Sequence, residues 1–123
     1  MTSIKKTIWP KPSSELIDIL DKHMSRFTSE KRNMFGCPCY FINGNMFAGI
    51  FSDGLFARFS PRDRDHLDKL GLGADFEPVE GRKMREYRTL TKRVLETPGE
   101  LDRWLMRAYS YASRLEPKRK RKR

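Results

Sequence analysis

Apolar residues are most concentrated between Met34 and Phe59, and two turn signals divide this stretch into three segments. Asn43-Gly44 is typical of a tight hairpin turn, because both central positions of a primed turn need positive φ, which Gly adopts freely and Asn better than most residues. Ser52-Asp53-Gly54 marks a second reversal. The pattern therefore predicts a three-stranded antiparallel meander, with strands over residues 37–42, 46–51 and 55–59.

The second and third segments of this meander distribute their apolar residues differently. Residues 46–51 are apolar on both faces, as in a central strand covered on both sides, and Gly49 within them indicates a bulge or the close approach of another backbone. Residues 55–59 alternate, with one face fully apolar and Arg58 on the other face beside Phe56. Two interpretations of Arg58 stay open: a packed stem with its head in water, or an ion pair or anion site.

Two helices are predicted on either side of the meander. Apolar residues recur at helical spacing over residues 14–27, after a serine cap. Ser60-Pro61 begins the other helix, with Ser as the cap and Pro in the first position, and Gly71 ends it. The charges of this second helix, Asp63 among them, are mixed, and such a run predicts a solvated face rather than an active site.

The rest of the chain extends the sheet and adds a third helix. Residues 28–33 predict a polar connection, and residues 75–77 a short strand. Residues 84–91 fit both a helical and an alternating pattern, and the proline and glycine before them favour a strand. Thr97-Pro98-Gly99-Glu100 has the pattern of a capping box ahead of an apolar helix that Pro117 ends. The predicted fold class is α+β: an antiparallel sheet, built from a three-stranded meander plus about two further strands, packed with three helices.

The positive charge is concentrated at one end of the chain. The 123 residues carry a formal net charge of +10, and the unbroken basic run from Lys118 to Arg123 supplies more than half of it. A block of like charges repels itself and predicts disorder, while the length fits a single domain. We expect an extended arm over residues 1–12 around Trp9, one domain over residues 13–117, and a disordered basic tail over residues 118–123.

The sequence carries neither a membrane-span pattern nor a secretory-signal pattern. No run approaches the roughly 18 apolar residues of a membrane helix. The N-terminus, with Lys5, Lys6 and Pro10, lacks the apolar centre of a secretory signal. We therefore expect a soluble, cytoplasmic protein with no membrane partner.

Cys37 and Cys39 are the residues with the most reactive side chains. They share one face of a strand, but cysteines two residues apart cannot form an unstrained disulfide. A zinc site needs about four ligands, and His23 and His66 lie far off in the sequence. The simplest interpretation is two small core residues, and a redox or metal role is the alternative. Both histidines are predicted to be structural.

Several common catalytic motifs are missing from the sequence. It has no G-x-S-x-G elbow, no P-loop glycine cluster followed by Lys-Ser or Lys-Thr, and no H-E-x-x-H pair. A nucleophilic cysteine would require a nearby base, which the sequence does not place. The sequence therefore predicts that the protein is not an enzyme and has no catalytic residue, no cofactor and no metal ligand.

A series of short motifs in a fixed order points to a known family. The motifs are Met34-Phe35-Gly36, FINGNMFAG over residues 41–49, Asp53-Gly54-Leu55, Arg58, Asp63-Arg64, Phe76-Glu77-Pro78, Gly81-Arg82, Met84, Glu86-Tyr87 and Trp104-Leu105. Together they resemble the N-terminal domain of the TfoX/Sxy competence-regulator family, from about Trp9 to Lys118. The resemblance implies an α+β domain. It also implies a regulatory role, because in some bacteria full-length relatives promote transcription of DNA-uptake genes together with a cyclic-AMP receptor protein.

The resemblance carries over no catalytic residue. The family's characteristic positions have structural explanations as turns and close-packing sites; they are Phe35, Gly36, Asn43, Gly44, Asn45, Met46, Phe47, Gly49, Arg58, Gly81, Met84 and Tyr87. Two features depart from the family. The regulators carry a second, C-terminal domain where this sequence has only the basic tail, and Arg88 and Thr89 stand where apolar strand residues are usual. The second departure predicts an edge strand with a wet outer face.

Three functional hypotheses follow from these observations. The first is a non-catalytic regulatory or adaptor domain that binds a protein partner, for example a transcription factor. The second is non-specific association with nucleic acid through the tail residues Lys118, Arg119, Lys120, Arg121, Lys122 and Arg123, although a basic tail also serves solubility alone. The third is a small enzyme of unknown class. Exposed edge strands would in addition support a homodimer.

Overall fold

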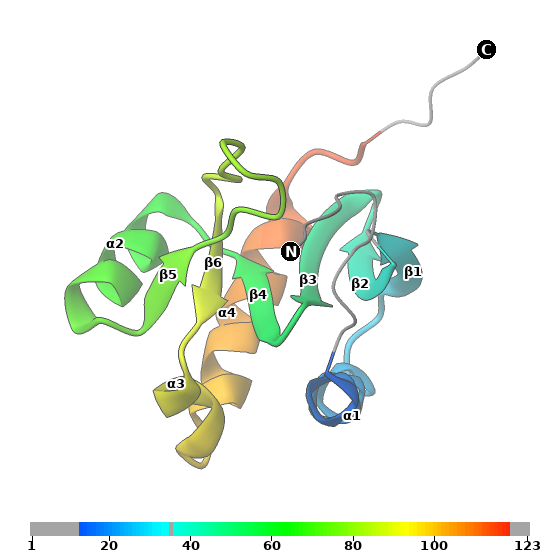
Figure 1. Ribbon diagram of the computed structural model, residues 1–123. Helices are drawn as coiled ribbons and strands as arrows, with labels where there is room; N and C mark the ends of the chain where they lie inside the picture. The colour runs from blue at the N-terminus through cyan, green and yellow to red at the C-terminus, as the bar shows by residue number, and fades with distance from the viewer. Residues whose placement is uncertain (1–12, 35, 119–123) are drawn as a thin grey trace.

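One antiparallel sheet forms the centre of the chain (Figure 1). The computed structural model describes residues 13–34 and 36–118, and within them six strands are hydrogen-bonded in the order β1-β2-β3-β4-β6-β5. The strands are β1 (Glu30–Met34), β2 (Cys37–Ile42), β3 (Asn45–Phe51), β4 (Gly54–Arg58), β5 (Gly73–Asp75) and β6 (Tyr87–Leu90). The helices in the same residues are α1 (Ser14–Met24), α2 (Pro61–Leu70), α3 (Lys92–Glu96) and α4 (Glu100–Arg114). The predicted α+β class is confirmed, whereas the predicted arm, Phe35 and the tail beyond Lys118 lie outside the described residues.

The predicted meander forms where its turn signals place it. Asn43 and Gly44 have φ values of 52° and 84°, and Ser52 has a φ of 58°, so both reversals use the left-handed region. Strand β2 has the predicted bounds, and β3 and β4 each begin one residue earlier than predicted. The register between β2 and β3 shifts between Tyr40 and Phe41, opposite Ala48 and Met46, so the bulge does not fall at Gly49, which pairs regularly with Cys39.

Strand β1 lies where the sequence predicted a polar connection. Its first four residues are exposed, and it forms the sheet edge by pairing antiparallel with β2, Arg32 opposite Cys39. Such a strand has no apolar alternation, so the sequence pattern could not predict it. It is a strand because its backbone is hydrogen-bonded to β2. Helix α1 ends at Met24 rather than at residue 27, and the backbone N–H of Phe27 donates to the Met24 carbonyl in the turn that follows.

The predicted capping box at Thr97 is not formed. The residue before α4 is Gly99, with a φ of 84° and no side-chain cap. Thr97 instead ends the short helix α3, which the sequence did not predict, and its Oγ1 donates to the Arg93 carbonyl at 2.6 Å. Glu100 accepts from the indole nitrogen of Trp104 at 3.2 Å. The motif therefore ends one helix and begins the next. The side chains of Thr97 and Glu100 bond to Arg93 and Trp104 instead of to each other's backbone N–H groups, as a capping box requires.

Strand β6 is internal, so the predicted wet edge strand is wrong. It pairs with β4 on one side and with β5 on the other, and the edges of the described sheet are β1 and β5. Arg88 of β6 is tolerated inside the sheet because Asp68 of α2 neutralises it, with Nε 2.8 Å from the carboxylate. Because a residue distant in the sequence neutralises Arg88, a charged residue at this position does not indicate whether the strand lies at an edge of the sheet.

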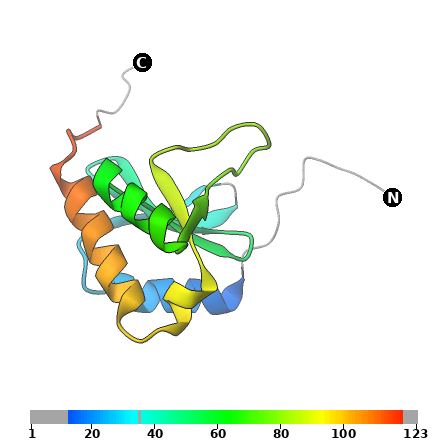
Figure 2. The same cartoon turned by 90° about the vertical axis from the view of Figure 1, so that its left-hand side faces the viewer.

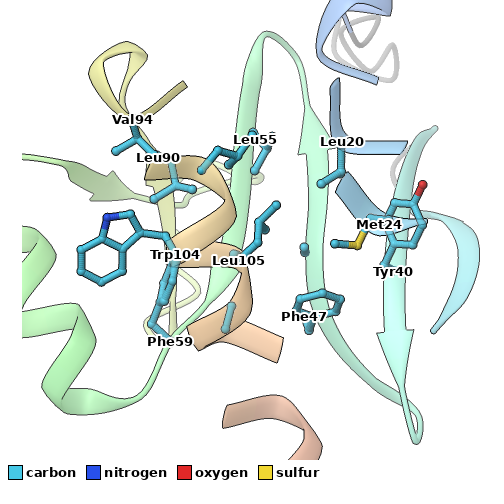
Figure 3. Close-up of a cluster of buried hydrophobic side chains, with 14 of the residues drawn as sticks. Leu20, Met24, Tyr40, Phe47, Leu55, Phe59, Leu90, Val94, Trp104 and Leu105 are labelled. Carbon is cyan, nitrogen blue, oxygen red and sulfur yellow. The ribbon is translucent and has the colours of Figure 1, made fainter. Parts of the chain in front are cut away.

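The two faces of the sheet carry separate apolar clusters. All four helices contribute to the larger cluster, around Leu20, Phe47, Leu55, Trp104 and Leu105, which Figure 3 shows between the strands and the helices. On the opposite face lies a smaller cluster, made of Cys39, Phe41, Met46, Phe56, Phe76 and Tyr87. Figure 2 shows α1 and α4 on one side of the sheet and the loop over residues 76–86 on the other. We call the second side the loop face, and its covering segment the β5–β6 loop.

Candidate functional site

Aromatic stacking fixes the β5–β6 loop on the sheet. The Phe76 ring lies 4.0 Å from that of Phe56 at 17°, and it meets Phe51 edge-on at 6.0 Å. The Met84 N–H donates to the Phe76 carbonyl at 2.9 Å, which ties the two ends of the loop together. Within the loop, the Gly81 N–H donates to the Glu77 carboxylate at 2.5 Å. The loop is therefore internally braced and anchored by one aromatic side chain.

Tyr87 and Arg58 link the loop to the sheet. The Tyr87 hydroxyl donates to the Met46 carbonyl at 2.9 Å, and burial raises the pKa of this phenol to about 12. The guanidinium of Arg58 lies over the Tyr87 ring, 5.4 Å from its centroid, and its Nε donates to Glu86 at 2.7 Å. The side chain of Arg58 is 19% exposed. Of the two interpretations of Arg58, the ion pair is the one that the structure shows.

Gly49 lies where a side chain cannot fit. A Cβ added there would come within 2.7 Å of Cys39 Sγ, 2.8 Å of Phe56 Cζ and 3.0 Å of the Pro38 carbonyl oxygen. A backbone approaches closely as predicted, through the Pro38 oxygen, but the two nearest atoms belong to the side chains of Cys39 and Phe56. Its tight contacts exist because β2 and β4 crowd β3 on the loop face.

The two cysteines are buried thiols of the sheet. Both are free, with exposed fractions of 1% for Cys37 and 0% for Cys39. Burial raises the pKa of the Cys39 thiol to about 12. Because the thiolate is the reactive and metal-binding form, Cys39 carries no nucleophile at neutral pH. This position agrees with the interpretation of two small core residues.

The loop face brings together half of the family-motif positions. They are Met46, Gly49, Arg58, Gly81, Met84 and Tyr87, which come from β3, β4, the β5–β6 loop and β6. Phe47 points to the opposite face, in the larger cluster, and Gly36 occupies the turn before β2 with a φ of 73°. Phe35 lies outside the described residues. The order of these motifs in the sequence did not reveal that they converge.

The remaining motif positions, in the β2–β3 turn, hold the C-terminal segment. The Lys118 N–H donates to the Asn43 carbonyl at 2.8 Å, and the Asn45 side-chain amide donates to the Glu116 carbonyl at 3.0 Å. A Cβ on Gly44 would come within 2.8 Å of the Lys118 carbonyl oxygen. Gly44 is thus required both by its positive φ and by this contact. Of the six predicted nucleic-acid-binding residues, only Lys118 lies in the described part, and the turn fixes its backbone.

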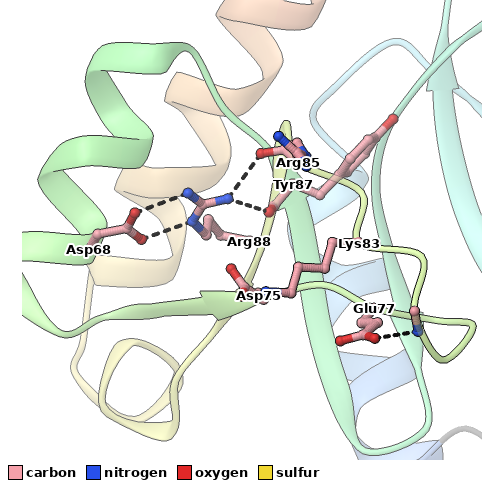
Figure 4. Close-up of polar contacts among 8 residues, drawn as sticks. Asp68, Asp75, Glu77, Lys83, Arg85, Tyr87 and Arg88 are labelled. Carbon is pink, nitrogen blue, oxygen red and sulfur yellow. Dashed lines mark hydrogen bonds and ion pairs between the residues drawn. The ribbon is translucent and has the colours of Figure 1, made fainter.

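Two ion pairs join α2 to its neighbours, against the prediction of a fully solvated face. The Asp63 side chain is only 9% exposed, and its Oδ1 lies 3.1 Å from Arg107 of α4. Asp68 accepts two hydrogen bonds from Arg88, at 2.8 and 2.9 Å (Figure 4). These bonds hold the pKa of Asp68 below its ordinary value. Sequence spacing could not indicate either pair, because the partners lie on distant elements.

A second basic side chain converges with Arg88 on the loop. Arg88 Nη1 and Arg64 Nη1 each donate to the Arg85 carbonyl at 3.0 Å, and Figure 4 shows Arg88 between Asp68 and the Arg85 and Tyr87 carbonyls. The Nε of Arg64 is buried and has no hydrogen-bond partner in the part of the chain that the structure describes. Arg64 is thus held by one backbone carbonyl of the β5–β6 loop, and its charge helps to lower the pKa of Asp68.

The β5–β6 loop curves around a hollow of about 720 Å³. Its lining combines apolar and charged residues: Glu77, Pro78, Val79, Gly81, Arg82, Lys83, Met84 and Arg85. Val79 is 42% exposed, one of three large apolar side chains open to solvent in the described part of the chain. The hollow is a surface depression next to the anchored motif residues, and we treat it as the candidate binding site.

The histidines have structural contacts, as predicted. His23 Nδ1 lies 2.8 Å from Asp102 Oδ1, which Arg26 also contacts at 2.8 Å. The His66 ring meets Trp104 edge-on at 5.8 Å. Over residues 13–34 and 36–118, no three His, Cys, Asp or Glu side chains are grouped to hold a metal ion. No helix in those residues is long and apolar enough to cross a membrane.

Comparison with known proteins identifies the family. A sequence model of the TfoX N-terminal domain matches residues 24–112, which is most of the chain and includes every strand of the sheet. Searches of curated proteins and of solved structures gave no match. The matched range begins in α1, ends in α4, and contains the loop face with its motif residues. The chain therefore belongs to the TfoX N-terminal domain family.

Proposed function

We propose that this protein is a non-catalytic regulatory or adaptor domain that acts through contacts with another protein, in the control of transcription. The observation that carries the proposal is the family match over residues 24–112, together with the convergence of the motif residues on one face. A braced loop with an exposed apolar residue, Val79, is a feature suited to recognition.

The polar groups of the loop face support a binding role rather than a catalytic one. Arg58 is paired with Glu86, and the Tyr87 hydroxyl donates to a backbone carbonyl. Burial raises the pKa values of Tyr87 and Cys39 to about 12, so both groups stay protonated at neutral pH. A general base needs a pKa near the working pH, and neither group has one. These side chains hold the loop in place and leave its outer surface available for a partner.

Crosslinking in the host cell tests the proposal. The full chain, tagged and expressed at its natural level, is crosslinked, purified and analysed by quantitative mass spectrometry against an untagged strain. We expect one transcription factor, crosslinked to the β5–β6 loop, to be enriched in every replicate. If no crosslinked peptide maps to a partner protein, the proposal is wrong.

The docked C-terminal segment favours a second candidate, non-specific association with nucleic acid. The β2–β3 turn fixes the backbone of Lys118, so the basic run from Lys118 to Arg123 starts from a defined point of the domain. Each phosphate neutralised on duplex DNA changes the slope of log K against log salt by about 0.9, which gives at most roughly −5 for the six charges. Deleting residues 118–123 should abolish a salt-sensitive gel shift, and an unchanged shift would remove this candidate.

A further inference from the structure

The hollow inside the β5–β6 loop has an edge of basic side chains. We propose that this hollow binds a short acidic segment of a partner protein, with an apolar side chain of that segment against Val79 and its carboxylates on Arg82 and Arg85. The inference rests on the proposed role in protein contacts and adds to it the surface and the chemistry of the partner.

The acidic residues around the hollow are mostly neutralised from within the domain. Asp68 pairs with Arg88, Asp75 with Lys83 at 3.1 Å, and Glu86 with Arg58. Glu77 accepts the Gly81 N–H. Glu80 is the acid of the loop that has no partner in the described part of the chain. Four of the five carboxylates are therefore already occupied.

Two arginines of the lining, Arg82 and Arg85, have no carboxylate partner among the described residues. Arg64 is not one of them, because it bonds to the Arg85 carbonyl at 3.0 Å, its Nε is buried, and its charge acts on Asp68. Arg82 and Arg85 are exposed at the edge of the hollow. The unpaired positive charges at the hollow therefore outnumber the one unpaired negative charge, that of Glu80. Guanidinium groups bind carboxylates through paired hydrogen bonds, so an acidic partner complements this edge.

The floor of the hollow suits an apolar side chain. Pro78, Val79 and Met84 line it, and its volume of about 720 Å³ falls in the range of small-ligand and peptide sites. Methionine adapts its shape to a bound group. The loop is already braced by the Arg82 N–H on the Val79 carbonyl at 2.8 Å, so little ordering is needed on binding.

The same features disfavour a nucleic-acid backbone as the occupant. A phosphate track needs a continuous row of cations, and here the lining has only Arg82, Lys83 and Arg85, of which Lys83 is already paired with Asp75. Single-stranded bases need aromatic faces on which to stack, and the lining of the hollow contains none. An acidic peptide with one apolar side chain complements both the arginines at the edge of the hollow and the apolar residues that line it.

Peptide binding to the full chain provides the test. The probe is a fluorescein-labelled peptide of alternating glutamate and leucine, followed by fluorescence anisotropy at low salt, with alternating lysine–leucine and glutamate–serine peptides as comparisons. The loop variant is Arg82→Gln with Arg85→Gln. The matched control is Lys92→Gln with Arg93→Gln on α3, which removes the same charge from two exposed residues at the other end of the molecule (Figure 1).

We expect the glutamate–leucine peptide to bind the natural chain and the control equally, and the loop variant about tenfold more weakly. The variant Val79→Ser should lose affinity for this peptide and keep its weak binding of the glutamate–serine peptide. Equal affinities of the loop variant and the control for the glutamate–leucine peptide would overturn the inference. It would also be overturned if the loop variant bound duplex DNA more weakly than the natural chain but bound this peptide equally well. If crosslinking still finds a partner in those cases, the proposed function stands and its surface lies elsewhere.

Discussion

Gly49 provides the sharpest test of how the loop face is packed. Substituting Gly49→Ala places a Cβ at 2.7 Å from Cys39 Sγ, 2.8 Å from Phe56 Cζ and 3.0 Å from the Pro38 oxygen. Carbon atoms in favourable contact lie about 3.5–4.0 Å apart, so neighbours on two sides must shift by roughly 0.7–1 Å. Overpacking of this kind costs about 1–3 kcal/mol, and the lower chain entropy of Ala returns about 0.5–1 kcal/mol.

Because three atoms lie inside contact distance, we take the upper end of that cost, about 3 kcal/mol, and expect Gly49→Ala to reduce the free energy of unfolding by about 2 kcal/mol. At this chain length, that corresponds to a fall of roughly 8 °C in Tm. Urea and thermal unfolding of the full chain, followed by circular dichroism, measure both quantities. Gly71→Ala is the comparison, since Gly71 has a φ of 70° and nothing within 4 Å of its added Cβ. That variant isolates backbone strain, which we expect to cost about 1 kcal/mol.

A double-mutant cycle separates crowding from other effects. Cys39→Ala removes the nearest atom, so Gly49→Ala should cost about 1 kcal/mol less in that background than in the natural chain. The reasoning would be refuted if Gly49→Ala costs no more than Gly71→Ala. It would also be refuted if the cost of Gly49→Ala is the same with and without Cys39.

Three further predictions follow from the same structure. The Cys39 thiol, whose pKa burial raises to about 12, should react with maleimide at neutral pH at least about a hundredfold more slowly in the native protein than in guanidinium; rapid native labelling would contradict this. Arg88 lowers the pKa of the half-exposed Asp68, so this pair stabilises the fold above about pH 4 and ceases to do so as the pH falls through the lowered pKa; Asp68→Asn should cost up to about 1 kcal/mol at pH 7 and progressively less as the pH falls below 4, as urea unfolding over this pH range would measure. Gly44→Ala should destabilise the full chain by about 1 kcal/mol more than a chain lacking residues 116–123, because its Cβ meets the docked C-terminal segment; equal costs in urea unfolding would show that this contact is absent.

The meander could be predicted closely because its signals are local. Asn43-Gly44 has the backbone angles that the turn chemistry demands, and β2 has the predicted bounds. The alternation along residues 55–59 also placed Phe56 on the face opposite Leu55, where the structure has it. These features depend on a few neighbouring residues, so the sequence carries them without knowledge of the fold.

The candidate site could be predicted only in its parts. The motif residues were recognised, but their convergence on the loop face requires β6 to lie next to β4, which no spacing in the sequence states. The hollow and its unpaired arginines depend on which carboxylates are already used. Glu86 reaches Arg58 across 28 positions of the chain, and Asp68 reaches Arg88 across 20.

The sequence by itself determined the secondary structure of the meander, the apolar face of α4 and the family of the protein. The tertiary structure alone decided that the exposed residues of β1 form a strand, that Asp63 is buried against Arg107, and that β6 is internal. The physical reason is range: turn angles and apolar periodicity act between neighbours, whereas ion pairs and strand order join residues that only the folded chain brings together.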